Sequence, residues 1–148
     1  MNSETKGGNK GMKTATQLQG GCLCGALRYR VSAEPFDSDY CHCSQCRKST
    51  GAMAACWMDF KTDQVNWLKG TPKEYASSDT IRRGFCDQCG TSISYRSTDY
   101  PDYYTLSIAS LDNPNAVAPR YHIHTDQQPD WLIISDDLPR YRQSRSQG

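Results

Sequence analysis

The sequence predicts a small, mainly β protein with a single domain. Its 148 residues are a typical length for one compact domain. Short segments rich in apolar, β-branched and aromatic residues alternate with turn-forming residues along most of the chain. In addition, no stretch carries the sustained apolar stripe at positions i, i+3, i+4 and i+7 that an amphipathic helix needs.

The first strand is expected at residues 26–31, where apolar and charged residues alternate with the two-residue period of a half-buried strand. The continuous apolar run at 53–60 predicts a strand that is buried on both faces. Between them, residues 44–50 are the one segment expected to be helical, as a short turn between Cys43 and Gly51. Composition predicts further strands at 64–68, 81–85, 91–95, 103–108 and 121–124.

Charge and hydropathy exclude two classes of partner. The 17 Lys and Arg residues nearly balance the 16 Asp and Glu residues, so the chain lacks the basic field of a general nucleic-acid binder. No apolar run approaches the roughly 20 residues of a membrane-spanning helix. We therefore expect neither a nucleic acid nor a membrane as partner.

Residues 1–19 are polar and rich in Gly and Lys, and they are expected to form a disordered leader. They contain neither the apolar segment nor the cleavage pattern of a secretory signal, so we expect a cytoplasmic protein. The domain is expected to span 20–140, followed by a flexible tail at 141–148. In a reducing compartment, clustered cysteines favour metal binding or catalysis over disulfides.

Seven of the eight cysteines fall into three tight groups. Cys86 and Cys89 form a Cys-X-X-Cys turn followed by Gly90, which is free to take a positive φ, and this is the shape of a zinc knuckle. A closed structural zinc site has four ligands, whereas a catalytic site has three and an open position, so seven cysteines divide plausibly into four and three. The alternative is that Cys41, Cys43 and Cys46, the middle group, form a second closed site with one external ligand. The other two groups are Cys22 with Cys24, and Cys41, Cys43 and Cys46.

These motifs resemble the glutathione-dependent formaldehyde-activating enzyme family, which also includes the zinc-binding part of centromere protein V. The resemblance covers roughly residues 20–138 and is carried by segments 20–25, 41–48 and 85–91, with Tyr29 and Gly51. A weaker match continues through Pro119, His122, Ile123 and Trp131.

The resemblance implies a tent-like arrangement of short antiparallel sheets around two zinc ions. It places a structural zinc on Cys22, Cys24, Cys86 and Cys89. It places a second, open zinc on Cys41, Cys43 and Cys46, with His42 between two of these ligands and expected to point away.

An open three-thiolate zinc is suited to activating a small thiol, because a thiol that coordinates zinc loses its proton and the thiolate is the nucleophile. In the family this becomes the addition of glutathione to formaldehyde, which gives S-(hydroxymethyl)glutathione and is formally a carbon–sulfur lyase reaction in reverse. We expect an enzyme of this kind, acting on glutathione or an analogue and on formaldehyde or a related electrophile. The alternative is a zinc-stabilised interaction module in which both zinc ions are structural.

Several side chains are candidates for roles beside the metal. Arg47 and Lys48 follow the last cysteine of the middle group and are suited to holding the carboxylates of glutathione. His122 is a further substrate-binding candidate, and it is expected to share one strand face with His124. Arg82 and Arg83, which precede Cys86, either offset thiolate charge or line a strand. The eighth cysteine, Cys56, is expected to be a buried small apolar residue.

Overall fold

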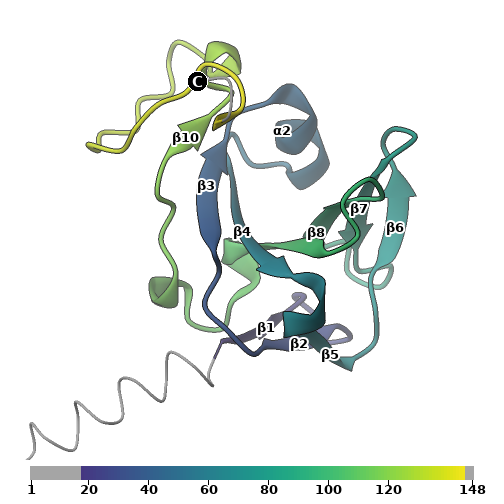
Figure 1. Cartoon of the computed structure of the whole chain (residues 1–148). Helices are drawn as coiled ribbons and strands as arrows, with labels where there is room; N and C mark the ends of the chain where they lie inside the picture. The colour runs from purple at the N-terminus through teal and green to yellow at the C-terminus, as the bar shows by residue number, and fades with distance from the viewer. Residues whose placement is uncertain (1–17, 146–148) are drawn as a thin grey trace, which may run out of the picture.

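The structure is a computed structural model that describes residues 18–145 (Figure 1). It has ten short strands, one α-helix, α2 (Ser44–Thr50), and four 3₁₀ turns. The strands are β1 (Gln19–Gly21), β2 (Arg28–Val31), β3 (Asp37–Cys41), β4 (Ala55–Lys61), β5 (Val65–Lys69), β6 (Lys73–Ala76), β7 (Ile81–Phe85), β8 (Ser92–Ser97), β9 (Tyr103–Ser107) and β10 (His122–Ile123). The 3₁₀ turns are η1 (Thr62–Gln64), η2 (Ile108–Ser110), η3 (Pro114–Ala116) and η4 (Thr125–Gln127).

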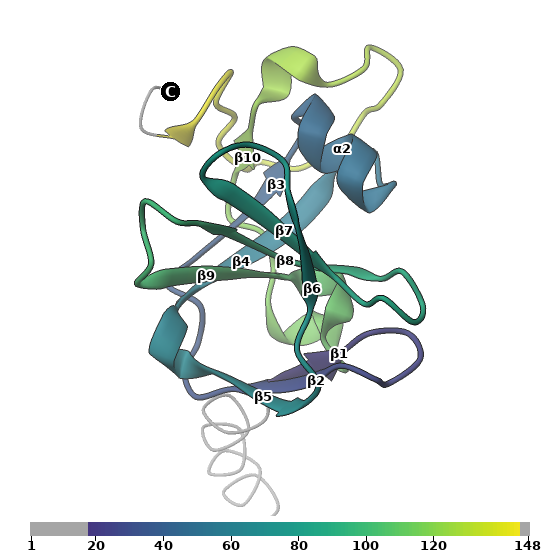
Figure 2. The ribbon, with the colours of Figure 1, turned by 90° about the vertical axis from the view of Figure 1, so that its right-hand side faces the viewer.

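The strands form two sheets, which confirms the mainly β fold. The larger sheet has the order β10-β3-β4-β9-β8-β7-β6, and the smaller one has the order β1-β2-β5. In the larger sheet the neighbouring strands are antiparallel, except that β10 runs parallel to β3. Figures 1 and 2 show the small sheet crossing one end of the large one, while α2 lies at the opposite end, beside β3 and β4.

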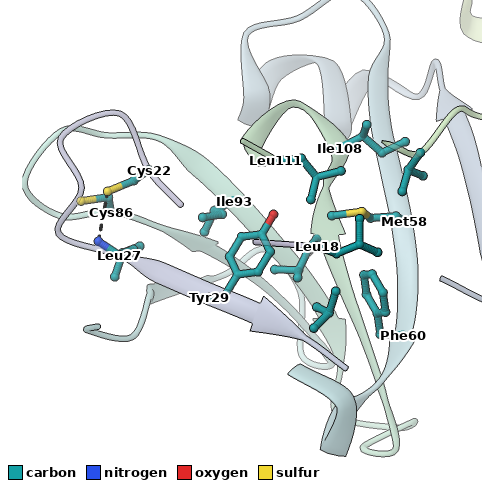
Figure 3. Close-up of a cluster of buried hydrophobic side chains, with 13 residues drawn as sticks. Leu18, Cys22, Leu27, Tyr29, Met58, Phe60, Cys86, Ile93, Ile108 and Leu111 are labelled. Carbon is teal, nitrogen blue, oxygen red and sulfur yellow. Dashed lines mark hydrogen bonds between the residues drawn. The ribbon is translucent and has the colours of Figure 1, made fainter. Parts of the chain in front are cut away.

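The hydrophobic core lies between the two sheets (Figure 3). Met58 and Phe60 are two residues apart on β4, so they share a face, and both are fully buried. They belong to the same buried cluster as Leu106 of the large sheet and Tyr29 of the small one. Burial of side chains this large stabilises the fold by about 1.5–3 kcal/mol each. The Tyr29 hydroxyl is satisfied by the Ser110 hydroxyl at 2.7 Å.

Helix α2 begins and ends at the residues that its sequence predicts. At its start, the Cys43 sulfur accepts a hydrogen bond from the backbone N–H of Cys46 at 3.3 Å. At its end, Gly51 takes the left-handed conformation with φ of 78°, and its N–H donates to the Arg47 carbonyl. The predicted helix at 44–50 is therefore confirmed, and it places Cys43 and Cys46 within a single turn.

Most of the predicted strands are confirmed, with ends that differ by a few residues. Three strands were not predicted: β1, β3 and β6. Strand β3 is rich in Asp and Ser, residues that are rare in strands, and β6 is a largely exposed edge strand. The predicted strand at 121–124 is shorter than expected because His124 has φ of 55°, which ends the extended backbone.

Both predicted ends of the domain need correction. Leu18 is buried in the core and Gln19 begins β1, although both were assigned to the leader. Residues 1–17 of that leader lie outside the described residues. In the predicted tail, the Tyr141 N–H donates to the His122 carbonyl and the Gln143 carbonyl accepts from His124, so these residues are held against β10. Residues 146–148 lie outside the description. Within residues 18–145, no helix combines the length and apolarity required to cross a bilayer.

Candidate metal centres and the adjoining cavity

A group of four cysteines joins two loops that are far apart in the sequence. Cys22 and Cys24 lie between β1 and β2, whereas Cys86 and Cys89 lie between β7 and β8. All four sulfurs lie within 4.8 Å of one another, with Cys24 Sγ 3.7 Å from Cys22 Sγ and 3.9 Å from Cys86 Sγ. Four thiolates at tetrahedral zinc are about 3.8 Å apart, because each Zn–S bond is about 2.3 Å long. The spacing of this four-cysteine group fits a closed metal site.

The backbone of the two loops is shaped around these sulfurs. The Leu27 N–H donates to Cys22 Sγ at 3.2 Å, as Figure 3 shows, and the Gln88 N–H donates to Cys86 Sγ at 3.4 Å. Gly90 closes the second loop with φ of 82°, and its N–H donates to the Cys86 carbonyl. These features agree with the knuckle predicted from the Cys-X-X-Cys-Gly motif.

Thr91 connects the two loops. Its hydroxyl oxygen accepts the Leu23 N–H at 3.1 Å, which leaves the hydroxyl proton for Cys89 Sγ at 3.3 Å. This hydrogen bond is the main cause that lowers the pKa of Cys89 to about 5. A thiol that ionises easily is a good metal ligand, because the thiolate is the form that coordinates.

The three-cysteine group lies at the other buried cluster of the molecule. Cys41 ends β3, Cys43 caps α2 and Cys46 lies in its first turn, and the three sulfurs lie within 4.8 Å of one another. Hydrogen bonds from the Cys41 and Cys46 thiols and from the backbone hold the pKa of Cys43 well below its usual range. Within residues 18–145, no fourth His, Cys, Asp or Glu side chain belongs to this group. It offers a metal three ligands and leaves a position open.

Arg83 supplies positive charge to this group. It is buried, and its Nη1 lies 3.6 Å from Cys46 Sγ and 3.2 Å from Ser49 Oγ. Its guanidinium carbon lies 5.1 Å from the centre of the Tyr95 ring, within the range of a cation–π contact. Of the two interpretations of Arg83 from the sequence, the structure supports the one in which it offsets thiolate charge.

A cavity of about 820 Å³ adjoins the three-cysteine group. Its floor is one face of the large sheet, because residues that alternate along a strand share a face and paired residues lie opposite each other. The register places Trp57 opposite Asp39, Thr105 opposite Asp59, and Tyr95 between Thr105 and Arg83. The cavity lining includes these residues together with Cys41, Cys43, Cys46, Phe36, Tyr100, Tyr103 and His124.

Asp39 and Asp59 form one acidic part of the cavity lining, the acidic wall. Burial raises the pKa of Asp39 to about 8 and that of Asp59 to about 6, in each case with a smaller contribution from neighbouring carboxyl groups. Asp59 accepts a hydrogen bond from the Thr105 hydroxyl at 2.7 Å. Asp39 Oδ1 is buried without a hydrogen-bond partner among the described residues. Neither carboxyl is predicted from the sequence, although the spacing of Asp37, Asp39 and Cys41 is the two-residue period of one strand face.

The two histidine expectations have different outcomes. His42 points away from the metal group, as expected: its Nε2 lies 2.9 Å from Nδ1 of His122. His122 is fully buried, stacks on Tyr40 at 4.5 Å and reaches Asp136 Oδ2 with its Nε2 at 2.9 Å. It does not line the cavity, whereas His124 does. The expectation that these two histidines share a strand face is wrong, because the backbone turns at His124.

The structure places the basic residues that follow the three-cysteine group away from the large cavity. Neither Arg47 nor Lys48 lines it, and Lys48 lines a separate pocket of about 550 Å³. That pocket is also lined by residues of β7 and β8, so Lys48 lies beside the sheet but outside the large cavity. Cys56 is half-buried against the core, and burial raises the pKa of its thiol to about 11.

Comparisons with known proteins follow the same motifs. A family model described as glutathione-dependent formaldehyde-activating enzyme matches residues 17–127. A Halomonas elongata protein named "Putative glutathione-dependent formaldehyde-activating enzyme" is 29% identical over 126 residues, which are 79% of this chain and 80% of that protein. A Schizosaccharomyces pombe protein named "Uncharacterized lyase" is 25% identical over 114 residues, 77% of this chain and 82% of the relative.

A solved structure has the same fold. It is the crystal structure of a Rhodobacter sphaeroides protein, with a TM-score of 0.55 and 26% sequence identity. The match covers 70% of this chain and 93% of that protein.

Proposed function

The chain belongs to the glutathione-dependent formaldehyde-activating enzyme family, and on this basis we propose that it is a zinc-dependent carbon–sulfur lyase. In the synthetic direction it joins a small thiol, glutathione or an analogue, to formaldehyde or a related electrophile. The four-cysteine group, Cys22, Cys24, Cys86 and Cys89, holds a structural zinc. The three-cysteine group, Cys41, Cys43 and Cys46, holds the second zinc at the reaction site.

The observation that carries this proposal is the position of the two groups relative to the cavity. All residues of the three-cysteine group line the cavity, whereas no residue of the four-cysteine group does. Bound there, zinc supplies a position at which a substrate thiol ionises. Cys22 and Cys86 of the four-cysteine group belong to the core that joins the sheets, where a bound metal contributes to folding.

The chain's own residues support thiol chemistry at this place. Arg83 lies against Cys46 and balances part of the negative charge that three thiolates and a substrate thiolate would accumulate. Trp57 and Tyr95, whose ring centres lie 6.1 Å apart, give the cavity an aromatic surface beside the three-cysteine group. In the addition, the sulfur lone pair forms a C–S bond, the carbonyl π bond breaks, and the thiol proton goes to the former carbonyl oxygen.

The first test measures zinc content and glutathione binding on the same samples. We expect two zinc ions per chain on the purified protein, one of which is removed by mild chelation together with glutathione binding in calorimetry. The protein should also accelerate formation of S-(hydroxymethyl)glutathione above the uncatalysed background. Cys46→Ser should abolish both effects, and Cys56→Ser, which alters a cysteine outside both groups, should abolish neither.

The same measurements can also contradict the proposed enzymatic function. Two zinc ions that resist chelation, together with no glutathione binding, would indicate an interaction module with two structural metals.

A further inference from the structure

The acidic wall of the cavity is not required by thiol activation alone. Asp39 is only 7% exposed, it lines the cavity, and its Oδ1 is buried without a hydrogen-bond partner. A buried carboxyl group without a partner is costly, and in native proteins it calls for an explanation. A ligand that completes its hydrogen bonds is one such explanation.

The described part of the chain pairs no cation with this wall. Among residues 18–145, no ion pair joins an Arg, Lys or His side chain to Asp39 or Asp59. Arg83 donates to Cys46 and Ser49, at the opposite side of the cavity floor. Arg96 also lines the cavity, but its guanidinium pairs with Glu74 at 2.6 Å and is not paired with Asp39 or Asp59. A cationic ligand would supply the partner that the described residues do not give this wall.

The distance between the wall and the sulfurs sets the shape of that ligand. Asp39 precedes Cys41 by two residues on the same face of β3, a separation of about 7 Å along the strand. Asp59 lies on the neighbouring strand β4, opposite Asp37. Because Asp37 and Asp39 are two residues apart on β3, Asp59 lies on the same face of the sheet as Asp39. A ligand whose sulfur lies at the three-cysteine group thus reaches the acidic wall only with a group that is many bonds further along its chain, as the α-ammonium of glutathione is.

We propose that the cavity selects thiols that carry a protonated amine, and that Asp39 and Asp59 hold the ammonium group. This inference rests on the proposed function, which places the thiol at Cys41, Cys43 and Cys46. In glutathione the group that binds the wall is the α-ammonium of the γ-glutamyl residue. An ammonium has three N–H donors, so it can satisfy both carboxyls, whereas an acylated amine brings no charge.

The test compares glutathione with N-acetylglutathione, which keeps the thiol and both carboxylates but lacks the ammonium. On the zinc-loaded wild-type protein, we expect calorimetry to show binding of the acetylated thiol at least about tenfold weaker. Asp39→Asn should weaken glutathione binding by about tenfold and leave N-acetylglutathione binding unchanged, so that the preference largely disappears. Asp59→Asn, measured in the same way, provides a second variant if the first does not fold.

Asp99→Asn is the matched control. It removes the same charge from an exposed residue that also lines the cavity, and it should leave both affinities within about twofold. Equal binding of the two thiols to the wild type would overturn the amine preference and leave the proposed function standing. Binding of neither thiol would overturn both.

Discussion

Replacing Cys24 with alanine distinguishes a metal ligand from a side chain that only packs. The Cys24 side chain is exposed, so its loss removes little apolar contact. Its sulfur nevertheless lies 3.7 Å from Cys22 Sγ and 3.9 Å from Cys86 Sγ, as in a tetrahedral thiolate site. If the four-cysteine group holds zinc, this exposed residue is essential, and if it does not, the residue is nearly irrelevant.

The expected effect on the melting temperature is large. Metal binding to a structural site is folding free energy, and Cys24 contributes one of four ligands. Loss of about a quarter of that free energy lowers the Tm of a domain of this size by about 10 °C. The metal also joins the β1–β2 loop to the β7–β8 loop, so its loss frees both ends of the core that Cys22 and Cys86 help to form.

The assay is a thermal melt followed by circular dichroism, with zinc measured on each sample. Leu23→Ala is the matched control, because it changes the neighbouring residue, which is 88% exposed, and should shift Tm by less than about 2 °C. Added chelator should lower the Tm of the wild type and of Leu23→Ala, and it should lower the Tm of Cys24→Ala by less, because part of the stabilisation by the metal is already lost in this variant. If Cys24→Ala melts with Leu23→Ala and keeps the zinc content of the wild type, the assignment of the four-cysteine group as a metal site is refuted.

Four further substitutions test other parts of the structure. Cys46→Ser should remove one zinc and glutathione binding while shifting Tm far less than Cys24→Ala; an equal loss of stability would favour two structural metals. Arg83→Met, which removes the cation 3.6 Å from Cys46 Sγ, should weaken glutathione binding about tenfold in calorimetry, with partial recovery in Arg83→Lys; an unchanged affinity would show that the charge is not used. Tyr29→Phe removes the 2.7 Å hydrogen bond to Ser110, whose hydroxyl still donates to the Ser107 carbonyl, and should cost about 1 kcal/mol in urea denaturation; no loss would mean that the bond between Tyr29 and Ser110 adds nothing to stability. Burial raises the pKa of Asp59 to about 6, so the folded wild type loses stability when this carboxyl ionises. As pH rises from about 4 to 6, Asp59→Asn should therefore become more stable than the wild type, by up to about 3 kcal/mol. A pH-independent difference in stability between the two proteins would contradict this.

Local chemistry made much of the fold predictable from the sequence. Period-two alternation at 26–31 and the apolar run at 53–60 predicted strands that the structure contains. The helix at 44–50 was predicted with both ends, because Cys43 and Gly51 supply its caps within the segment itself. Strand β3 was missed because Asp39 faces the cavity and Ser38, on the other face, is buried with its hydroxyl bonded to the Ala118 carbonyl, so the usual apolar signal is absent.

The cysteine spacings likewise determined the local shape of the metal groups, but not their partners. A Cys-X-X-Cys turn and a cysteine at a helix cap are fixed by residues two or three positions apart. Cys24 and Cys86 are separated by 62 residues, and only the packing of the small sheet against the large one brings their sulfurs together. The resemblance to a family supplied this division of the cysteines before the structure did.

The sequence by itself determined a mainly β chain with a knuckle, a helix-capping cysteine and enough thiols for two metals. Only the tertiary structure decided what surrounds the three-cysteine group. Arg47 and Lys48 are its neighbours in sequence, yet Arg83 is the cation that contacts it, and Asp39 and Asp59 form a wall that no motif marked. The physical reason is that spacing along the chain controls a single turn, whereas strand order and register control which distant side chains share one face of a sheet.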